Sequence, residues 1–190
     1  MGIFIENKTF NKLDFTETPL EKGEYEYCIF SNCDFSDSDL TKITFLECKF
    51  YNCNLSMVKL TETALRNTKF KDCKMLGINF ENCNKFGLEI SFENCILNHS
   101  IFYKVRLKNT SFKDSQLHEI DFENCDLSNS IFDNCDLTRS IFNNSTLVNV
   151  DFRTAYNFEI DPELNKIKKA KFSIENLFGL LTKYDIKIER

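Results

Sequence analysis

Cysteine is the residue of this chain that most readily suggests metal or redox chemistry. Four of the cysteines, Cys33, Cys53, Cys73 and Cys95, recur about twenty residues apart, so neighbouring thiols could approach each other in a layered fold. The sequence contains no C-x-x-C pair, which argues against a zinc cluster or a redox motif. We therefore expect no metal, no cofactor and no disulfide framework, and free thiols that act as small buried apolar groups in a reducing, cytoplasmic compartment. The complete set is Cys28, Cys33, Cys48, Cys53, Cys73, Cys83, Cys95, Cys125 and Cys135.

Neither the histidines nor the common catalytic motifs indicate a catalytic site. The two histidines, His99 and His118, have no nucleophile partner at a fixed spacing, and both are expected to point outward. The sequence has no G-x-S-x-G, Walker A, H-E-x-x-H or glycine-rich dinucleotide motif. The sequence thus predicts a protein that is not an enzyme and has no small-molecule substrate.

Carboxylates form the most distinctive charged stretch. Residues 114–136 contain no lysine or arginine, although the formal net charge of the whole chain is only −5. This acidic belt is the candidate contact surface for a protein partner. Its members are Asp114, Glu119, Asp121, Glu123, Asp126, Asp133 and Asp136.

The element that must position these residues is revealed by a phenylalanine repeat. Nine phenylalanines follow one another at intervals of twenty, with one two-residue slip: Phe10, Phe30, Phe50, Phe70, Phe92, Phe112, Phe132, Phe152 and Phe172. Between Phe92 and Phe152 every fifth residue is Phe or Leu in strict alternation, and a small or β-branched residue stands two positions before each. A fixed repeat over almost the whole chain is the signature of a solenoid.

A period of five fits neither an α-helix nor a simple strand. It fits a coil with four short sides, in which each side turns one large and one small residue inward, here called the large slot and the small slot. Position i then returns to the same side at i+20, so Phe columns on opposite sides alternate with Leu columns. We expect a filled rod without a pocket, in which all nine cysteines occupy the small slot.

Three features depart from or modulate this repeat. The small slot is poorly occupied in the first repeats, so regular coil is predicted from about Cys28. Asparagines that precede small-slot cysteines are expected to turn corners with positive φ; they are Asn32, Asn52, Asn82, Asn94, Asn124 and Asn134. The register slip within residues 81–91 predicts a small loop at one corner, formed by Lys85, Phe86, Gly87, Leu88 and Glu89.

The C-terminal region breaks the pattern. Residues 1–172 are predicted as one repeat domain whose last coil, 153–171, is irregular, with Asp161 as an N-cap and Pro162 at a first helical position. Residues 173–190 are predicted to form a short α-helix and a short strand at 185–188. Either this helix caps the rod or its apolar face joins two rods, and we favour the dimer. That face comprises Ile174, Leu177, Phe178 and Leu181.

These residues resemble those of the pentapeptide-repeat family, whose units approximate A(D/N)Lxx. The resemblance is carried by segments such as CDFSDSDL (33–40), CDLSNSIF (125–132) and CDLTRSIF (135–142), and it covers roughly residues 28–152. It implies an all-β, right-handed quadrilateral β-helix. Residues 153–188 are similar to the C-terminal end of the Qnr-like branch, whose members bind type II topoisomerases as C-terminally joined dimers.

The resemblance implies that the partner is DNA gyrase or topoisomerase IV and that the acidic rod mimics duplex DNA, altering quinolone susceptibility. The charges support this only in part. A rod of this length would need on the order of 24 negative charges to match DNA, and the outward column Glu93, Lys113, Asp133, Arg153 alternates in sign. The alternative is a scaffold for an unrelated protein partner. In neither case do we expect direct nucleic-acid binding or a membrane-spanning segment.

Overall fold

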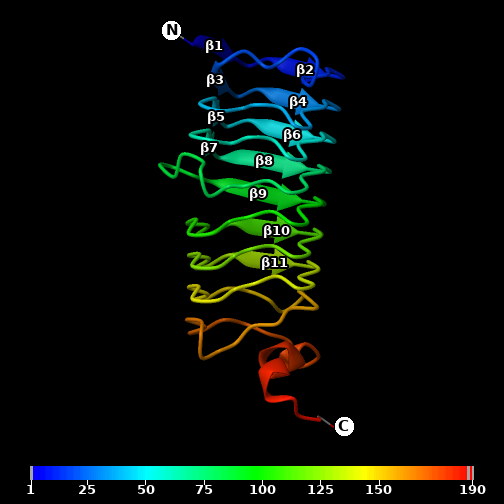
Figure 1. The fold of residues 1–190 in the computed structure, drawn as a ribbon, viewed down its shortest axis with the longest axis vertical. Coiled ribbons are helices and arrows are strands. Elements are labelled where there is room, and N and C mark those ends of the chain that lie inside the picture. The colour runs from blue at the N-terminus through cyan, green and yellow to red at the C-terminus, as the bar shows by residue number, and fades with distance from the viewer. Residues whose placement is uncertain (1, 188, 190) are drawn as a thin grey trace.

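The computed structural model describes residues 2–187 and 189, and it is a four-sided stack of parallel coils (Figure 1). One side is a four-stranded sheet in the order β1-β3-β5-β7, and a second is a seven-stranded sheet in the order β11-β10-β9-β8-β6-β4-β2. The predicted all-β quadrilateral solenoid is confirmed. The strands are β1 (Ile3–Glu6), β2 (Thr9–Asn11), β3 (Gly23–Glu26), β4 (Ile29–Ser31), β5 (Thr44–Leu46), β6 (Lys49–Tyr51), β7 (Ala64–Arg66), β8 (Thr68–Lys71), β9 (Ile90–Glu93), β10 (Ser111–Lys113) and β11 (Ile131–Asp133). Isolated parallel bridges continue the ladders on the remaining sides.

The core consists of the predicted columns. In the register of the seven-stranded sheet, Phe10 pairs with Phe30 and Phe112 with Phe132, so every layer adds one ring to the same column. The rings of Phe112 and Phe132 stack with centroids 4.8 Å apart and planes 2° apart. Phe122, from the opposite column, meets Phe132 edge-on at 82°. Stacking along the axis and edge-to-face contact across it are the favoured aromatic geometries, so the interior is filled by specific packing.

Side chains in the small slot also form hydrogen bonds between coils. The hydroxyl of Ser130 accepts a hydrogen bond from the Thr110 amide of the preceding coil and donates one to the Leu107 carbonyl. The thiol of Cys125 donates to the Phe102 carbonyl in the same way, at 2.8 Å. Serine, threonine and cysteine therefore recur here because each is small and also a donor, a reason that the size argument missed.

The nine cysteines are free and buried, as predicted. Burial raises the pKa of the Cys48 and Cys135 thiols to about 12, which keeps both protonated at neutral pH. Protonated buried thiols are poor nucleophiles, so these residues contribute to packing.

The corners use left-handed backbone throughout. Five of the six predicted asparagines, Asn32, Asn52, Asn94, Asn124 and Asn134, have φ between 50° and 58°. Asn82 does not adopt a positive φ, because it stands at the start of the register slip. In other coils the same corner position is occupied by residue types for which a positive φ is unfavourable. Tyr27, with φ of 51°, is an example.

The pairing interval changes from twenty to twenty-two residues between Asn84 and Ile90. Ala64 still bridges Asn84 at an interval of twenty, whereas Thr68 pairs with Ile90 at twenty-two. The extra residues leave the coil between these two rungs and project as a loop between β8 and β9, drawn in green (Figure 1). Gly87 has φ of +67°, a conformation that suits glycine.

The N-terminal prediction was wrong. Regular coil begins at β1, not near Cys28, since Ile3 already pairs with Gly23 and Thr9 with Ile29. Backbone pairing and the large-slot residues Phe10 and Phe15 suffice to build the first layer although the small slot is exposed there. Close packing against the first strand requires glycine at position 23, because a Cβ there would lie 2.2 Å from the Ile3 carbonyl oxygen.

The predicted C-terminal α-helix was also wrong. Instead, residues Leu177–Leu180 form the 3-10 helix η1 and Thr182–Tyr184 form η2. A tertiary contact takes a backbone group that an α-helix would need, because the Gly179 carbonyl accepts from the Ile160 amide; the Asn176 side chain, which donates to the Ala155 carbonyl, also fixes the segment against the last coil. The predicted helix start at Asp161-Pro162 forms only a turn, and residues 185–187 form no strand. Ile188, the last residue of that predicted strand, lies outside the described residues.

The irregular last coil keeps its place in the stack. Thr146 bridges Lys166, Asp151 bridges Lys171, and the ring of Phe172 stacks on that of Phe152 at 5.4 Å. Asn165 stands at the small slot, where its side-chain oxygen accepts from the Ser145 amide. None of the helices in the described part of the chain is long and apolar enough to cross a membrane.

Candidate partner-binding surfaces

The acidic belt wraps around the rod. Asp133 lies in β11, while Asp136, Asp121 and Asp126 each stand in a bridge ladder of a different side. Glu119 occupies a corner, with φ of 55°. The belt is therefore a ring of carboxylates around the coils of residues 114–136 and not a stripe along the axis.

Basic side chains of the rod lie close to four members of the belt. The Glu119 carboxylate lies 3.2 Å from Arg139 Nη1 and 3.3 Å from His99 Nδ1. Asp126 lies 3.1 Å from Lys108 Nζ. The other two pairs are Asp136 with His118 Nε2 at 2.9 Å and Asp114 with Lys113 Nζ at 4.0 Å.

Two belt carboxylates are also committed to the backbone of the rod. Partial burial alone would raise the pKa of Asp126, but hydrogen bonds from Ser128 and Lys108 outweigh it and lower that pKa. The same balance holds for Asp136, where hydrogen bonds from Thr138, Asn157 and His118 keep the pKa below its usual value. Both groups stay ionised at neutral pH, yet their charge stabilises the coil and is shielded from a partner.

Three acids of the belt lack a cationic partner in the described part of the chain. Among the described residues, Asp121, Glu123 and Asp133 have no cation within 4.0 Å. Asp121 accepts a hydrogen bond from the Glu123 amide at 2.8 Å, so these two residues belong to the same turn, whereas Asp133 is on another side. The belt thus offers two acids in one turn and a single acid elsewhere.

The corner loop presents an aromatic residue. The Phe86 side chain is 79% exposed, and its amide donates to the Asn84 side chain. The guanidinium of Arg66 lies over the Phe86 ring at 5.6 Å from its centroid. An exposed aromatic on a short, anchored loop is a typical contact residue of protein interfaces.

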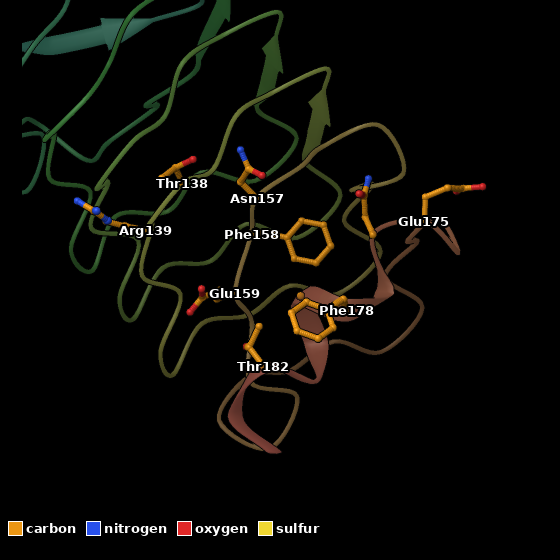
Figure 2. A pocket seen from close by; sticks show the side chains of 10 residues that line it. Thr138, Arg139, Asn157, Phe158, Glu159, Glu175, Phe178 and Thr182 are labelled. Carbon is orange, nitrogen blue, oxygen red and sulfur yellow. The ribbon is translucent and has the colours of Figure 1, made fainter. Parts of the chain in front are cut away.

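The C-terminal segment is anchored to the last coil by charge. Lys183 Nζ lies 2.7 Å from both Asp161 and Glu163, and the Tyr184 hydroxyl donates to Glu163 at 3.1 Å. Hydrogen bonding from Lys183 lowers the pKa of both carboxyl groups. A groove of about 600 Å³ remains between this segment and the rod, and Figure 2 shows Phe158 of the last coil and Phe178 of η1 among its lining residues.

The predicted dimer face is largely uncovered. Ile174 is 85% exposed, Phe178 53% and Leu177 41%, while Leu181 is half-buried. Leu164, Tyr184 and Ile186, in the last coil and the C-terminal segment, are also exposed, so exposed apolar side chains recur at the C-terminal end. Apolar patches of this kind mark sites of association.

A stack of four-sided parallel coils with Phe and Leu columns defines a solenoid protein built from five-residue units. The family model described as a pentapeptide repeat region matches residues 24–90 and 88–156. The chain therefore belongs to the pentapeptide-repeat family.

Solved structures share the whole fold. A trypsin-treated variant of QnrB1, described as a plasmid-mediated fluoroquinolone resistance protein, superposes with a TM-score of 0.72 over 100% of this chain and 93% of its own, at 17% identity. Full-length QnrB1 superposes with a TM-score of 0.63 over 97% of this chain and 100% of its own, at 15% identity. No curated protein matches the chain significantly in sequence.

Proposed function

We propose that this protein is a non-catalytic binding protein that engages a type II topoisomerase, DNA gyrase or topoisomerase IV, and modulates quinolone susceptibility. The observation that carries the proposal is the likeness to QnrB1, a fluoroquinolone resistance protein, along the entire chain including the C-terminal segment. Fluoroquinolones act on type II topoisomerases, which makes these enzymes the first partners to test.

Three surfaces would take part. The pair Asp121 and Glu123 with Asp133 supplies acidic contacts, the loop at Lys85–Glu89 supplies Phe86, and the apolar face of Ile174, Leu177, Phe178 and Leu181 joins two rods. Dimerisation through the C-termini would double the length of the rod and cover side chains that are otherwise exposed to water. The rod would bind the enzyme in the cytoplasm, with no direct contact to nucleic acid.

One observation favours a second function, a scaffold for an unrelated protein. Three of the seven belt carboxylates have a Lys or Arg of the same rod within 4.0 Å, and Asp136 lies 2.9 Å from the His118 imidazole, so the rod lacks the continuous negative surface that imitation of DNA requires. A scaffold would use the same loop and apolar face without competing with DNA.

The test is DNA supercoiling by purified gyrase with the protein titrated in, with and without a quinolone, at two salt concentrations. We expect inhibition that weakens with salt, or rescue of supercoiling from the drug, because exposed charges are screened by salt. The triple charge reversal Asp121→Lys, Glu123→Lys and Asp133→Lys should abolish the effect, whereas the same reversal at the compensated Asp114 should change it little. No effect of the wild-type protein at micromolar concentration on gyrase or topoisomerase IV would refute the proposal.

A further inference from the structure

A groove beside the corner loop carries the opposite charge to the belt. The loop contributes Lys85, Gly87, Leu88 and Glu89, followed by Ile90, and the next coil contributes Arg106, Lys108 and Asn109, enclosing about 350 Å³. The register slip creates this groove, because it lifts residues 85–89 off the coil that carries Arg106.

The cations of the groove are incompletely neutralised. Within the described part of the chain, Lys85 and Arg106 have no carboxylate within 4.0 Å, and Lys108 is paired with Asp126 at 3.1 Å. Lys85 Nζ instead donates to the Lys104 carbonyl at 3.4 Å. Glu89 is the one carboxylate that lines the groove. Three basic side chains thus face one acidic side chain in a protein of negative net charge.

The turn at residues 106–108 is one of several that lack the carboxylate found in other turns of the rod, and it is the one that lines the cationic groove. One residue after each small slot, an Asp or Asn often accepts a hydrogen bond from the amide two residues later. Asp121 and Asp126 do so at 2.8 and 3.2 Å, and Asp34 and Asp136 do the same. Arg106 occupies this position in its own coil, and no described group accepts a hydrogen bond from the Lys108 amide. That amide is therefore an unused donor, of a kind that binds a carboxylate oxygen elsewhere in the same rod.

We propose that this groove binds carboxylate side chains of an acidic peptide segment on a protein partner. An incoming carboxylate would accept from the Lys108 amide in place of the missing Asp, and the Arg106 guanidinium and Lys85 ammonium would neutralise its charge. The equivalent amides of other turns bind the carboxylates of Asp121 and Asp126, which favours a carboxylate, and so an acidic peptide, as the ligand. The inference deepens the proposed function by assigning charge to the partner segment, and it rests on that function only for the identity of the partner.

The test is fluorescence anisotropy of a labelled hexaglutamate peptide titrated with the full chain at low salt. Arg106→Asp should weaken binding at least about tenfold, the equivalent of one charge-assisted hydrogen bond. Because this substitution restores the Asp found in other turns, its unfolding midpoint should equal or exceed that of the wild type. The matched control is Lys74→Asp, which makes the same charge change at the same position of the repeat on a side away from the groove.

Two further readouts sharpen the result. The backbone amide of Lys108 should show one of the largest chemical-shift changes on addition of the peptide, and a hexaglutamine peptide should bind neither the wild type nor Arg106→Asp.

The inference is overturned if wild type and Arg106→Asp bind hexaglutamate equally, or if inorganic phosphate or duplex DNA displaces the peptide at lower concentration than free glutamate does. The titration contains no gyrase, so its failure leaves the proposed function standing. Peptide binding together with no effect on gyrase or topoisomerase IV would refute the proposed function alone.

Discussion

Replacing Ser130 by alanine tests the hydrogen-bonding role of the small slot. Ser130 is fully buried, and its hydroxyl links two groups of the preceding coil: it accepts from the Thr110 amide at 3.1 Å and donates to the Leu107 carbonyl at 2.6 Å. Alanine fits the space but leaves both groups without this partner. The Thr110 amide keeps only a long contact of 3.4 Å to the Leu107 carbonyl.

The magnitude follows from the cost of an unsatisfied buried group. Each such group costs about 1–3 kcal/mol, and the residual contact of Thr110 reduces the sum. We therefore expect Ser130→Ala to lower the free energy of unfolding by about 2–3 kcal/mol. Ser130→Cys should lose less than half as much, because the Cys125 thiol already donates to a carbonyl in the same geometry.

The measurement is urea unfolding followed by circular dichroism, comparing midpoints and slopes, because a stack of repeats need not unfold in two states. The matched control is Ser111→Ala in β10, where the serine points outward and is exposed, so its effect should stay within about 0.5 kcal/mol. If Ser130→Ala unfolds at the wild-type midpoint, the small slot selects for size alone and the argument is refuted.

The remaining predictions concern a corner, a pH dependence and the C-terminal face. Tyr27→Asn should raise the free energy of unfolding by about 0.5–1 kcal/mol, because asparagine tolerates a φ of 51° better, and a lower urea midpoint would contradict this. Hydrogen bonds from the side chain and amide of Thr41 lower the pKa of Asp39 to about 2. The ionised Asp39 carboxylate therefore contributes fully to the free energy of unfolding above its unfolded pKa of about 4, and this contribution is lost as the pH falls toward 2. Between these pH values the wild type should lose more stability than Asp39→Asn, and parallel stability curves would exclude that role. Phe178→Asp should convert a dimer to a monomer in analytical ultracentrifugation, whereas Phe86→Asp, at an exposed phenylalanine outside the face, should not; a monomeric wild type would refute the interface.

The sequence predicts the rod because its period is a direct consequence of the geometry. A residue every five positions can face inward only if the coil has short sides of equal length, so the columns from Phe92 to Phe152 are readable without coordinates. The loop was predictable for the same reason, since two extra residues in a strict register must leave it.

Other features depend on contacts between coils that the period does not encode. The residues that follow Ser173 have an apolar helical pattern, but Gly179 and Asn176 bond to the last coil, and the segment forms 3-10 turns instead. The first coil forms although its small slot is poor, because pairing with the second coil stabilises its backbone.

The candidate sites, like the fold, could be predicted only in part from the sequence. The acidic belt is evident in the sequence, but its compensation by Lys108 and Arg139 comes from residues one coil away, near i±20. The cationic groove was not predicted, since Lys85 and Arg106 meet only through the slip. One signal was available: Arg106 stands where the repeat consensus has Asp or Asn.

The most direct measurement is binding of the labelled full-length protein to purified gyrase, with linear duplex DNA added as competitor. We predict saturable binding that DNA displaces and that salt weakens, because the protein and DNA would share a charged site on the enzyme. Binding that DNA leaves unchanged would exclude mimicry and support the scaffold, and no binding to gyrase or topoisomerase IV would contradict the topoisomerase proposal.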